Sequence, residues 1–585
     1  MVRIWHRSVR WLSSVQVRIG ISASVLLICA ALFGVWYFWL EKRPPTCPGN
    51  FDLVIVGGEI LNGLGGAPFK ADIGIREGHL ACIGTVDAAR ANQVIDGSGL
   101  EVAPGFIDVH THIERNVPAN SAPFLAPNFI RQGVTTIITG NCGRSFLDIG
   151  RFFKLLDLNH AQLNVATLVG HNTIRLHVMK ESAAVPTQEQ LNQMKALTRA
   201  AMHDGALGLS TGLEYIPGAF AKTDEIVELA RTAADADGLY ASHIRDEGPN
   251  GMAAIREAIS IGERAGIHVH ISHFKAQGPN QWGSAQLRLD LVTSAEQNGL
   301  VVSLDQYPYT ASSTSIAVLV PSWLSEGGLS LARRRLSVAD TRKRVRNEML
   351  DQLRIAGWKD YSFARVAYYD FDHSFEGLTI ADITRTRGEL QSAKHQAKFT
   401  HTRFAPAIPT NRNNNESDLE RQADTVIDIF SHGDAQMVFF NMNEEDVETI
   451  MKDPEVMFGS DSGVREENAS VLPHPRGLGT FPRILGRYAR EKHLFTLEEA
   501  VRRMTSLPAA TFGLKDRGQI REGAWADLVV FDRNRVLDSA TYDQPLSNPE
   551  GIYYVIVNGS LVLDKGRLTN SLPGLVIRGS QVRPR

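Results

Sequence analysis

The chain has 585 residues and a formal net charge of −3 at pH 7. This near-neutral balance gives no support for a polyanion such as nucleic acid as a partner. The four cysteines by themselves do not decide between a reducing and an oxidising compartment.

The N-terminal region carries a candidate membrane anchor. Residues 19–40 form an apolar run without a charged side chain, close to the ~20 residues that cross a bilayer as a helix. Arginines precede the run, and positive residues favour the cytoplasmic side. We therefore expect a cytoplasmic segment at 1–18, an uncleaved transmembrane anchor at 19–40, a linker at 41–50 and a catalytic body outside the cytoplasm, which is the periplasm in a diderm bacterium. A cleaved signal peptide is the alternative, but its apolar core is usually shorter and ends with small residues, whereas this run ends in Trp-Tyr-Phe-Trp-Leu.

Two separated sections, 51–103 and 516–570, have the pattern of short strands joined by turns. Because they flank a longer α/β region, we expect them to join into one small β-sandwich that serves as a scaffold, with 571–585 as a tail. Cys47 lies in the linker and Cys82 in the first β section. Whether these two cysteines meet in a disulfide stays open, because the sequence does not show their separation in space.

Residues 104–515 have the pattern of eight strands that alternate with helices. Helical stretches such as 223–236 and 251–265 carry apolar residues three and four positions apart. Alternating strands and helices imply a parallel sheet, and eight such units imply a closed (β/α)8 barrel. After the first strand, which ends near residue 108, the predicted strands are 135–139, 164–169, 206–210, 238–242, 268–272, 301–304 and 456–460.

The connection between the last two predicted strands is far longer than an ordinary loop. From about 310 to 451 we expect an inserted subdomain beside the strand ends, where it could form a lid or a specificity wall. Its basic stretch at about 332–353 alternates with acidic residues, which favours a solvated helix face over a nucleic-acid surface.

Residues able to bind a metal or move protons stand at the ends of five predicted strands. His110 and His112 are two apart on one strand, so both imidazoles can reach one cation. Each residue alone has a simpler interpretation: a surface histidine pair, a small core cysteine, a buried histidine or an aspartate that caps a turn. Together they indicate one metal site, because catalytic groups of such barrels come from the C-terminal ends of several strands. The set is His110, His112, Cys142, His243, His273 and Asp461.

With these residues in place, the sequence resembles the amidohydrolase superfamily and, within it, the D-aminoacylases, which are N-acyl-D-amino-acid deacylases. The resemblance runs from about residue 52 to 559. Cys142 distinguishes the D-aminoacylases from other members of the superfamily. Dihydroorotases and hydantoinases typically bridge two metals with a carboxylated lysine, whereas D-aminoacylases place a cysteine thiolate among the ligands. The motifs that carry it are Pro-Gly-Phe-Ile-Asp-Val-His-Thr-His (104–112), Gly-Asn-Cys-Gly (140–143), Ser-Thr-Gly-Leu-Glu-Tyr (210–215), Ser-His-Ile-Arg-Asp-Glu (242–247), Ile-Ser-His-Phe-Lys (271–275), Asp-Gln-Tyr-Pro-Tyr (305–309), Gly-Ser-Asp (459–461), Pro-His-Pro-Arg (473–476) and the closing segment 518–531.

The resemblance implies a metallo-dependent hydrolase barrel that cleaves the amide bond of N-acyl-D-amino acids and releases a carboxylate and a free D-amino acid. It implies one tightly held Zn²⁺ on Cys142, His243 and His273, and a second, weaker position framed by His110, His112 and Asp461. Asp461 is the implied proton carrier between the attacking water and the leaving amine. The implied substrate-binding residues are Arg476, Lys275, Tyr215 and Tyr307; a surface ion pair is the less favoured alternative for Arg476.

Other residues and functions remain open. Arg245 lies near a strand end without a clear role, and His171, His432 and His474 are expected to be loop or supporting residues rather than ligands. A hydrolase of cyclic amides, a dipeptidase acting on D-residues and a non-catalytic anchored binding protein are the alternative functions. The sequence does not fix the acyl group, the side-chain preference, the stereochemical strictness, the metal number or the oligomeric state.

Overall fold

The computed structural model describes residues 45–120, 122–387, 417–466 and 471–579. The expected cytoplasmic segment and transmembrane anchor at 1–40 lie outside the described residues. Within the described ranges, none of the helices combines the length and the hydropathy needed to span a bilayer.

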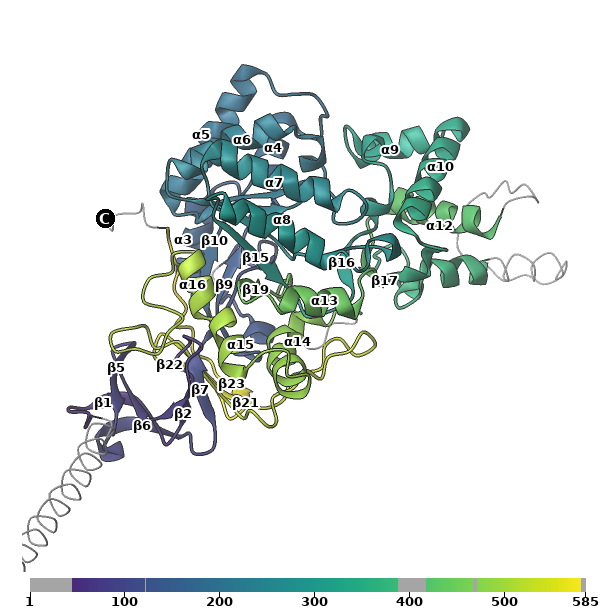
Figure 1. The fold of residues 1–585 in the computed structure, drawn as a ribbon. Coiled ribbons are helices and arrows are strands. Elements are labelled where there is room, and N and C mark those ends of the chain that lie inside the picture. The colour runs from purple at the N-terminus through teal and green to yellow at the C-terminus, as the bar shows by residue number, and fades with distance from the viewer. Residues whose placement is uncertain (1–44, 121, 388–416, 467–470, 580–585) are drawn as a thin grey trace, which may run out of the picture.

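A parallel barrel forms the centre of the molecule (Figure 1). Its strands follow one another around the ring in chain order. The ring closes where the last strand meets the first, since the backbone N–H of His112 donates to Ser462 O at 2.9 Å and that of Asp461 to His110 O at 2.8 Å. The predicted α/β fold is confirmed. The barrel strands are β8 (Phe106–Asp108), β9 (Val134–Thr139), β10 (Asn164–Thr167), β11 (Val169–Gly170), β12 (Gly208–Gly212), β13 (Leu239–His243), β14 (Val269–Ile271), β15 (Val302–Gln306) and β19 (Val456–Phe458).

The third predicted strand, 164–169, is interrupted in the structure. β10 pairs with β9 on one side, β11 pairs with β12 on the other, and Leu168 between them donates its N–H to Thr139 O. The two pieces therefore act as one barrel strand with a kink. The strands β8, β9 and β12 to β14 are buried along their whole length. Because neither face of such a strand meets solvent, their sequences lack the alternation of apolar and polar residues that is typical of half-exposed strands.

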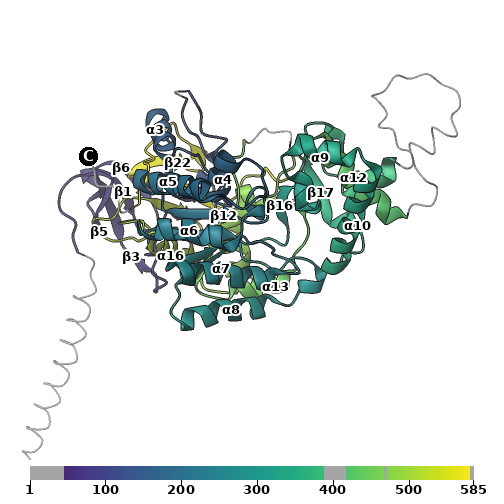
Figure 2. The same cartoon turned by 90° about the horizontal axis from the view of Figure 1, so that it is seen from above.

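Helices cover the outside of the barrel (Figure 2). α5 shows how the sequence sets their limits: Thr187 and Gln190 form a capping box at its start, and Gly205 ends it with φ 113°. The helices around the barrel are α2 (Pro127–Ile130), α3 (Ile149–Asn159), α4 (His171–Met179), α5 (Gln188–Asp204), α6 (Thr223–Ala234), α7 (Gly251–Ala265), α8 (Ala285–Gln297), α13 (Glu444–Met451), α14 (Arg476–Arg483), the π-helical η8 (Ile484–Glu491), α15 (Leu497–Met504) and α16 (Ser506–Thr511).

The two terminal β sections meet in one unit, drawn in purple and yellow at the lower left of Figure 1. β7 from the first section pairs with β20 from the second, and a shared apolar core joins this sheet to a second, four-stranded one. Cys47 and Cys82 form a disulfide that ties the start of the described chain to β5. The strands are β1 (Phe51–Val56), β2 (Glu59–Ile60), β3 (Phe69–Lys70), β4 (Asp72–Arg76), β5 (His79–Gly84), β6 (Ala91–Asp96), β7 (Glu101–Pro104), β20 (Leu528–Phe531), β21 (Ile552–Val557), β22 (Ser560–Asp564) and β23 (Arg567–Leu568).

The long connection after β15 forms a separate body with its own apolar core, at the right of Figures 1 and 2. The expected single basic helix is two helices, α9 and α10, separated at Ser337 and Val338. The core of the insertion ends at Phe439, and α13 packs with the barrel, so the insertion is shorter than the expected 310–451. Its elements are β16 (Ser312–Ser315), α9 (Leu329–Leu336), α10 (Ala339–Ala356), β17 (Ala364–Tyr368), α12 (Asp418–His432) and β18 (Gln436–Phe439).

Candidate metal centre and active site

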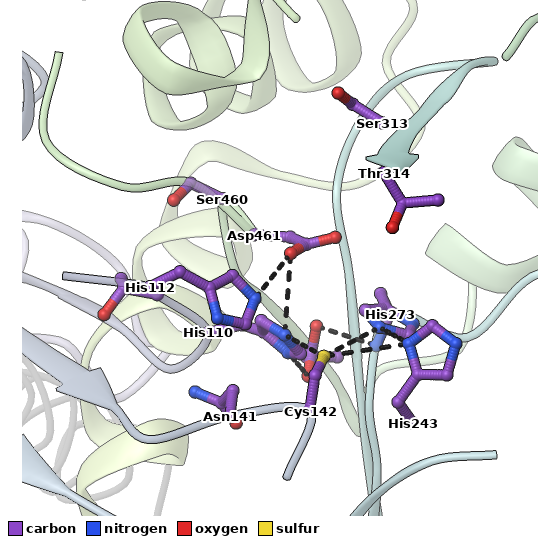
Figure 3. A network of polar contacts seen from close by, with 12 residues as sticks. His110, His112, Asn141, Cys142, His243, His273, Ser313, Thr314, Ser460 and Asp461 are labelled. Carbon is purple, nitrogen blue, oxygen red and sulfur yellow. Dashed lines mark hydrogen bonds and ion pairs between the residues drawn. The ribbon is translucent and has the colours of Figure 1, made fainter. Parts of the chain in front are cut away.

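The six predicted ligands lie together at the C-terminal mouth of the barrel (Figure 3). Three of them stand just after a strand with a left-handed backbone: Cys142 at φ 51°, His273 at φ 36° and Asp461 at φ 49°. This conformation is uncommon for residues other than glycine and costs roughly 1–3 kcal/mol each. Such strain concentrates at functional sites, where it holds a side chain in a direction that the strand alone would not give.

Cys142, His243 and His273 form a buried cluster. Cys142 Sγ lies 3.7 Å from His243 Nδ1 and 3.6 Å from His273 Nε2, and these two nitrogens are 2.8 Å apart. Burial, reinforced by the charge of Asp461, raises the pKa of the Cys142 thiol well above its ordinary value. Three donor atoms therefore converge on one point, and a cation there would reverse the electrostatics that keep the thiol protonated.

Two glutamates that the sequence analysis did not single out support this cluster. Glu214 Oε2 lies 2.9 Å from His243 Nε2, and Glu247 Oε1 lies 2.8 Å from His273 Nδ1. A carboxylate accepts only, so His243 carries its hydrogen on the outer Nε2 and presents a lone pair from Nδ1. Lys275 Nζ is 2.5 Å from the same Glu247 oxygen and 2.8 Å from His273 Nδ1.

The charge state of this cluster suits metal binding. Burial, followed by the nearby Lys275 ammonium, lowers the pKa of His273 to about 3, so its imidazole is neutral. Burial favours a raised pKa for Glu247, but Lys275, His273 and His243 together outweigh it and the pKa is lowered. Neutral imidazoles backed by ionised carboxylates are the usual arrangement around a bound metal.

His110, His112 and Asp461 form a second cluster next to the first. Asp461 Oδ1 lies 3.0 Å from His112 Nε2 and 3.7 Å from His110 Nε2, and the same His110 nitrogen is 3.3 Å from Cys142 Sγ. His110 and Cys142 therefore link the two clusters. His112 is the most open member, with 28% of its side chain exposed.

The guanidinium of Arg476 has two partners within the site. Its Nη1 lies 2.9 Å from Asp461 Oδ2, and its Nη2 donates to Ser313 O at 3.2 Å. Both side chains of the pair are nearly buried, so the surface ion pair left open above is excluded. Burial alone would raise the pKa of Asp461, but Arg476, His110 and His112 lower it well below its usual range. Asp461 is therefore a carboxylate at neutral pH.

A buried aspartate beneath the site connects the two clusters. Asp305 Oδ2 lies 3.4 Å from His110 Nδ1 and 2.8 Å from His270 Nε2, and Asp305 Oδ1 accepts from the backbone N–H of His273 at 3.0 Å. Asp305 is the first residue of the Asp-Gln-Tyr-Pro-Tyr motif, and no role was predicted for it. Its position near the C-terminal end of β15, at the same edge of the barrel as the candidate ligands of neighbouring strands, could have predicted a role in the site.

The other predicted binding residues line the mouth. The Tyr307 ring has the guanidinium of Arg476 4.7 Å above its centroid and Lys275 Nζ 5.4 Å from it, and its buried hydroxyl has no hydrogen-bond partner among the described residues. Tyr215 packs against the His243 ring at 4.6 Å, and its hydroxyl accepts from Thr314 Oγ1 at 3.2 Å. Ser313 and Thr314 belong to β16, so the insertion forms one wall of the site (Figure 3).

The residues that the sequence analysis set aside lie outside the cluster. Arg245 binds Glu257, and His171 binds Glu225. His474 bonds to Ala311 O at 2.9 Å, and His432 caps α12 in the insertion by bonding Asp428 O.

Comparison with known proteins decides the family. The amidohydrolase family model matches residues 93–563. The chain belongs to the amidohydrolase family. It is 34% identical to an N-acyl-D-glutamate deacylase and to a D-aminoacylase, both from Alcaligenes xylosoxydans xylosoxydans, with 90% of this chain and 97% of each relative covered. The crystal structure of an N-acyl-D-glutamate deacylase from Bordetella bronchiseptica, complexed with zinc and a phosphonate inhibitor, matches with a TM-score of 0.72 and 34% identity over 91% of this chain and all of that one.

Proposed function

We propose that this amidohydrolase is a zinc-dependent N-acyl-D-amino-acid deacylase. The observation that carries the proposal is the buried meeting of Cys142, His243 and His273 beside the ionised Asp461. Relatives that are similar over nine tenths of the chain act on N-acyl-D-glutamate or are D-aminoacylases, which supports the same substrate class.

The donor set fits zinc. A thiolate sulfur at ~2.3 Å and an imidazole nitrogen at ~2.0 Å from one tetrahedral zinc are roughly 3.5 Å apart, close to the 3.6 and 3.7 Å found here. Three protein ligands leave one position for water, as a catalytic zinc requires. His110, His112 and Asp461 offer a second position, which we propose to be weaker because His112 is open and Asp461 is engaged by Arg476.

Cys142, His243 and His273 would hold the zinc ion, which would supply Lewis acidity to polarise the amide carbonyl and to lower the pKa of a water to about 7. Asp461 then acts as the base, because its carboxylate is ionised and faces the cluster. It takes a proton from the attacking water and delivers it to the amide nitrogen, so that a neutral amine leaves. Arg476 holds one carboxylate oxygen and leaves Oδ1 for the proton transfer.

Substrate placement falls to the group around Tyr307. The Tyr307 hydroxyl has no hydrogen-bond partner among the described residues. Lys275 contacts Glu247 and His273 and keeps one further N–H to donate. Both Lys275 and Arg476 lie against the Tyr307 ring. We assign the α-carboxylate of the substrate to Tyr307, Lys275 and Arg476. A cyclic-amide hydrolase that depends on a carboxylated lysine fits less well, because Lys275 is engaged with Glu247 and His273.

We also propose that the catalytic body lies outside the cytoplasm and is anchored by residues 19–40. The Cys47–Cys82 disulfide supports this, since such bonds persist in oxidising compartments. Alkylation of membrane fractions before and after reduction tests it: the two cysteines should react only after reduction. Reaction without reduction in intact cells would contradict the proposal.

The test of the activity is turnover of paired N-acetyl-D- and N-acetyl-L-amino acids by the purified, zinc-supplemented protein, with Asp461→Asn as control. Release of free D-amino acid that is lost in the control supports the deacylase and the proton carrier together. Absence of release from both series, with one zinc still bound per chain, would reject the substrate class.

A further inference from the structure

The cationic side chains at the mouth of the barrel differ in whether a carboxylate pairs with them. Lys275 pairs with Glu247, and Arg476 pairs with Asp461. Arg465 follows Asp461 by four residues, and within the described part of the chain its guanidinium has neither a hydrogen-bond partner nor an ion pair. Its Nε is buried, and a buried donor without a partner calls for an explanation.

The position of Arg465 is fixed by its surroundings. Asn128 Oδ1 accepts from the Arg465 backbone N–H at 3.0 Å, and Asn128 Nδ2 donates to Gly463 O at 3.3 Å and Gly477 O at 2.9 Å. This one amide thus ties the loop that carries Arg465 to the start of α14, which begins with Arg476.

A glycine makes room for the Arg465 side chain. A Cβ added to Gly477 would lie 3.1 Å from Arg465 Cγ and 3.4 Å from its Nε, which is tight contact. The stem of Arg465 therefore lies directly against the residue that follows Arg476. The Arg465 guanidinium lies near enough to Arg476 and Asp461 for the charges of both to affect its pKa.

Among the three cations Lys275, Arg476 and Arg465, only Arg465 has no carboxylate within ion-pair distance in the described part of the chain. Burial, followed by the charge of Arg476, lowers the pKa of Arg465 to about 10, so it still carries its charge at neutral pH. The α-carboxylate of a substrate is already served by Lys275, Tyr307 and Arg476. A second anionic group on the substrate would complement the remaining charge and satisfy the unpartnered donors.

We propose that Arg465 is a specificity-determining residue that binds a second carboxylate, and that the substrates are N-acyl-D-amino acids with acidic side chains. The inference rests on the proposed function. Overall similarity does not decide between acidic and neutral side chains, because the N-acyl-D-glutamate deacylase and the D-aminoacylase are equally identical to this chain.

The test compares N-acetyl-D-glutamate with N-acetyl-D-glutamine, which have nearly the same shape and differ in one charge. The wild-type protein should favour the glutamate in kcat/KM. Arg465→Gln should lower kcat/KM for the glutamate about 10- to 100-fold, the loss expected for a hydrogen bond to a charged group, mainly through KM. The glutamine should change less than about threefold, because its amide makes only a neutral hydrogen bond. Arg465→Lys, which keeps the charge, should recover part of the loss.

Two matched variants separate the interpretations. Arg256→Gln removes the same charge from the exposed face of α7 and should change neither substrate. Arg144→Gln removes an exposed guanidinium that stacks on Tyr215 at 5.6 Å and is the competing cation at the mouth. A selective loss in Arg144→Gln, or an equal loss on both substrates in Arg465→Gln, overturns the inference.

A binding measurement distinguishes failure of the inference from failure of the proposed function. Calorimetric titration of the zinc-loaded protein with D-glutamate and D-glutamine needs no turnover. If no N-acetyl-D-amino acid is cleaved but D-glutamate binds more tightly than D-glutamine and Arg465→Gln abolishes the difference, the proposed function fails and the acidic subsite stands. If neutral N-acetyl-D-amino acids are cleaved and Arg465→Gln does not change the glutamate-to-glutamine ratio, the proposed function stands and the inference fails.

Discussion

The two candidate metal positions share one rim of the barrel but differ in their support. Around Cys142, the imidazoles of His243 and His273 are at most 4% exposed, and a glutamate holds the outer nitrogen of each. Around Asp461, His112 is 28% exposed and the carboxylate is shared with Arg476. A closed, carboxylate-backed cluster is preorganised for one ion, whereas the open cluster is better suited to proton transfer and to weak occupancy.

The largest expected effect comes from the open cluster. Asp461→Asn keeps the shape and a carbonyl for Arg476 but cannot accept a proton, so kcat/KM should fall by about 10²- to 10⁴-fold. Zinc content should stay at one per chain, because Cys142, His243 and His273 are untouched. Steady-state kinetics and metal analysis on the same preparation test this. A loss of less than tenfold would assign the proton transfer to another group.

Removing Cys142 should break the closed cluster. Cys142→Ala leaves two imidazoles 2.8 Å apart without their third donor, so zinc affinity should fall by more than the roughly 10- to 100-fold that a supporting residue contributes. Metal analysis after dialysis should show less than one zinc per chain, and the circular dichroism spectrum should stay unchanged. Full retention of zinc would place the tight ion at the open cluster instead.

The supporting glutamates should have an intermediate effect. Glu214→Gln and Glu247→Gln each remove an ionised acceptor behind one imidazole, and we expect a 10- to 100-fold weaker zinc affinity, measured by competition with a chelator. Glu257→Gln is the matched control, because Glu257 pairs with Arg245 and contacts none of the candidate ligands in the described part of the chain. Equal zinc affinities in all three variants would show that the carboxylates do not orient the ligands.

His112→Gln should have a smaller effect, because it alters only the open cluster. The first zinc should stay bound and kcat/KM should change less than about tenfold, which corresponds to about 1.4 kcal/mol. Titration with excess zinc should show the second, weaker binding event in the wild type and not in the variant. Loss of the tight ion would mean that His112 belongs to the closed cluster.

Strand periodicity and residue chemistry predicted the barrel and placed all six candidate ligands at one rim, because parallel strands expose their C-terminal ends at the same edge. The supporting contacts were not predictable in this way. Glu214 and Glu247 reach histidines on neighbouring elements, and Arg476 meets Asp461 across a loop. Such pairings depend on loop paths rather than on local patterns. The limits of the insertion were missed for a similar reason, since only packing shows that α13 belongs to the barrel.

Beneath both positions runs a hydrogen-bonded chain that should respond to pH. His268 Nε2 and His270 Nδ1 each lie 2.9 Å from Ser303 Oγ, and His270 Nε2 lies 2.8 Å from Asp305 Oδ2, the residue that touches both clusters. Burial, followed by the charge of His270, lowers the pKa of His268 from 6.5 to about 4.

The folded protein therefore binds fewer protons at His268 than the unfolded chain does between pH 6.5 and 4. The contribution of His268 to the free energy of unfolding is fully present above pH 6.5 and is lost as the pH falls toward 4, by at most ~1.4 kcal/mol per pH unit. His268→Gln cannot titrate but keeps a group able to bond Ser303, so the decline of stability over this window should be shallower in the variant. Urea unfolding of the metal-free protein at several pH values measures both slopes. Parallel slopes would show that His268 titrates normally in the fold.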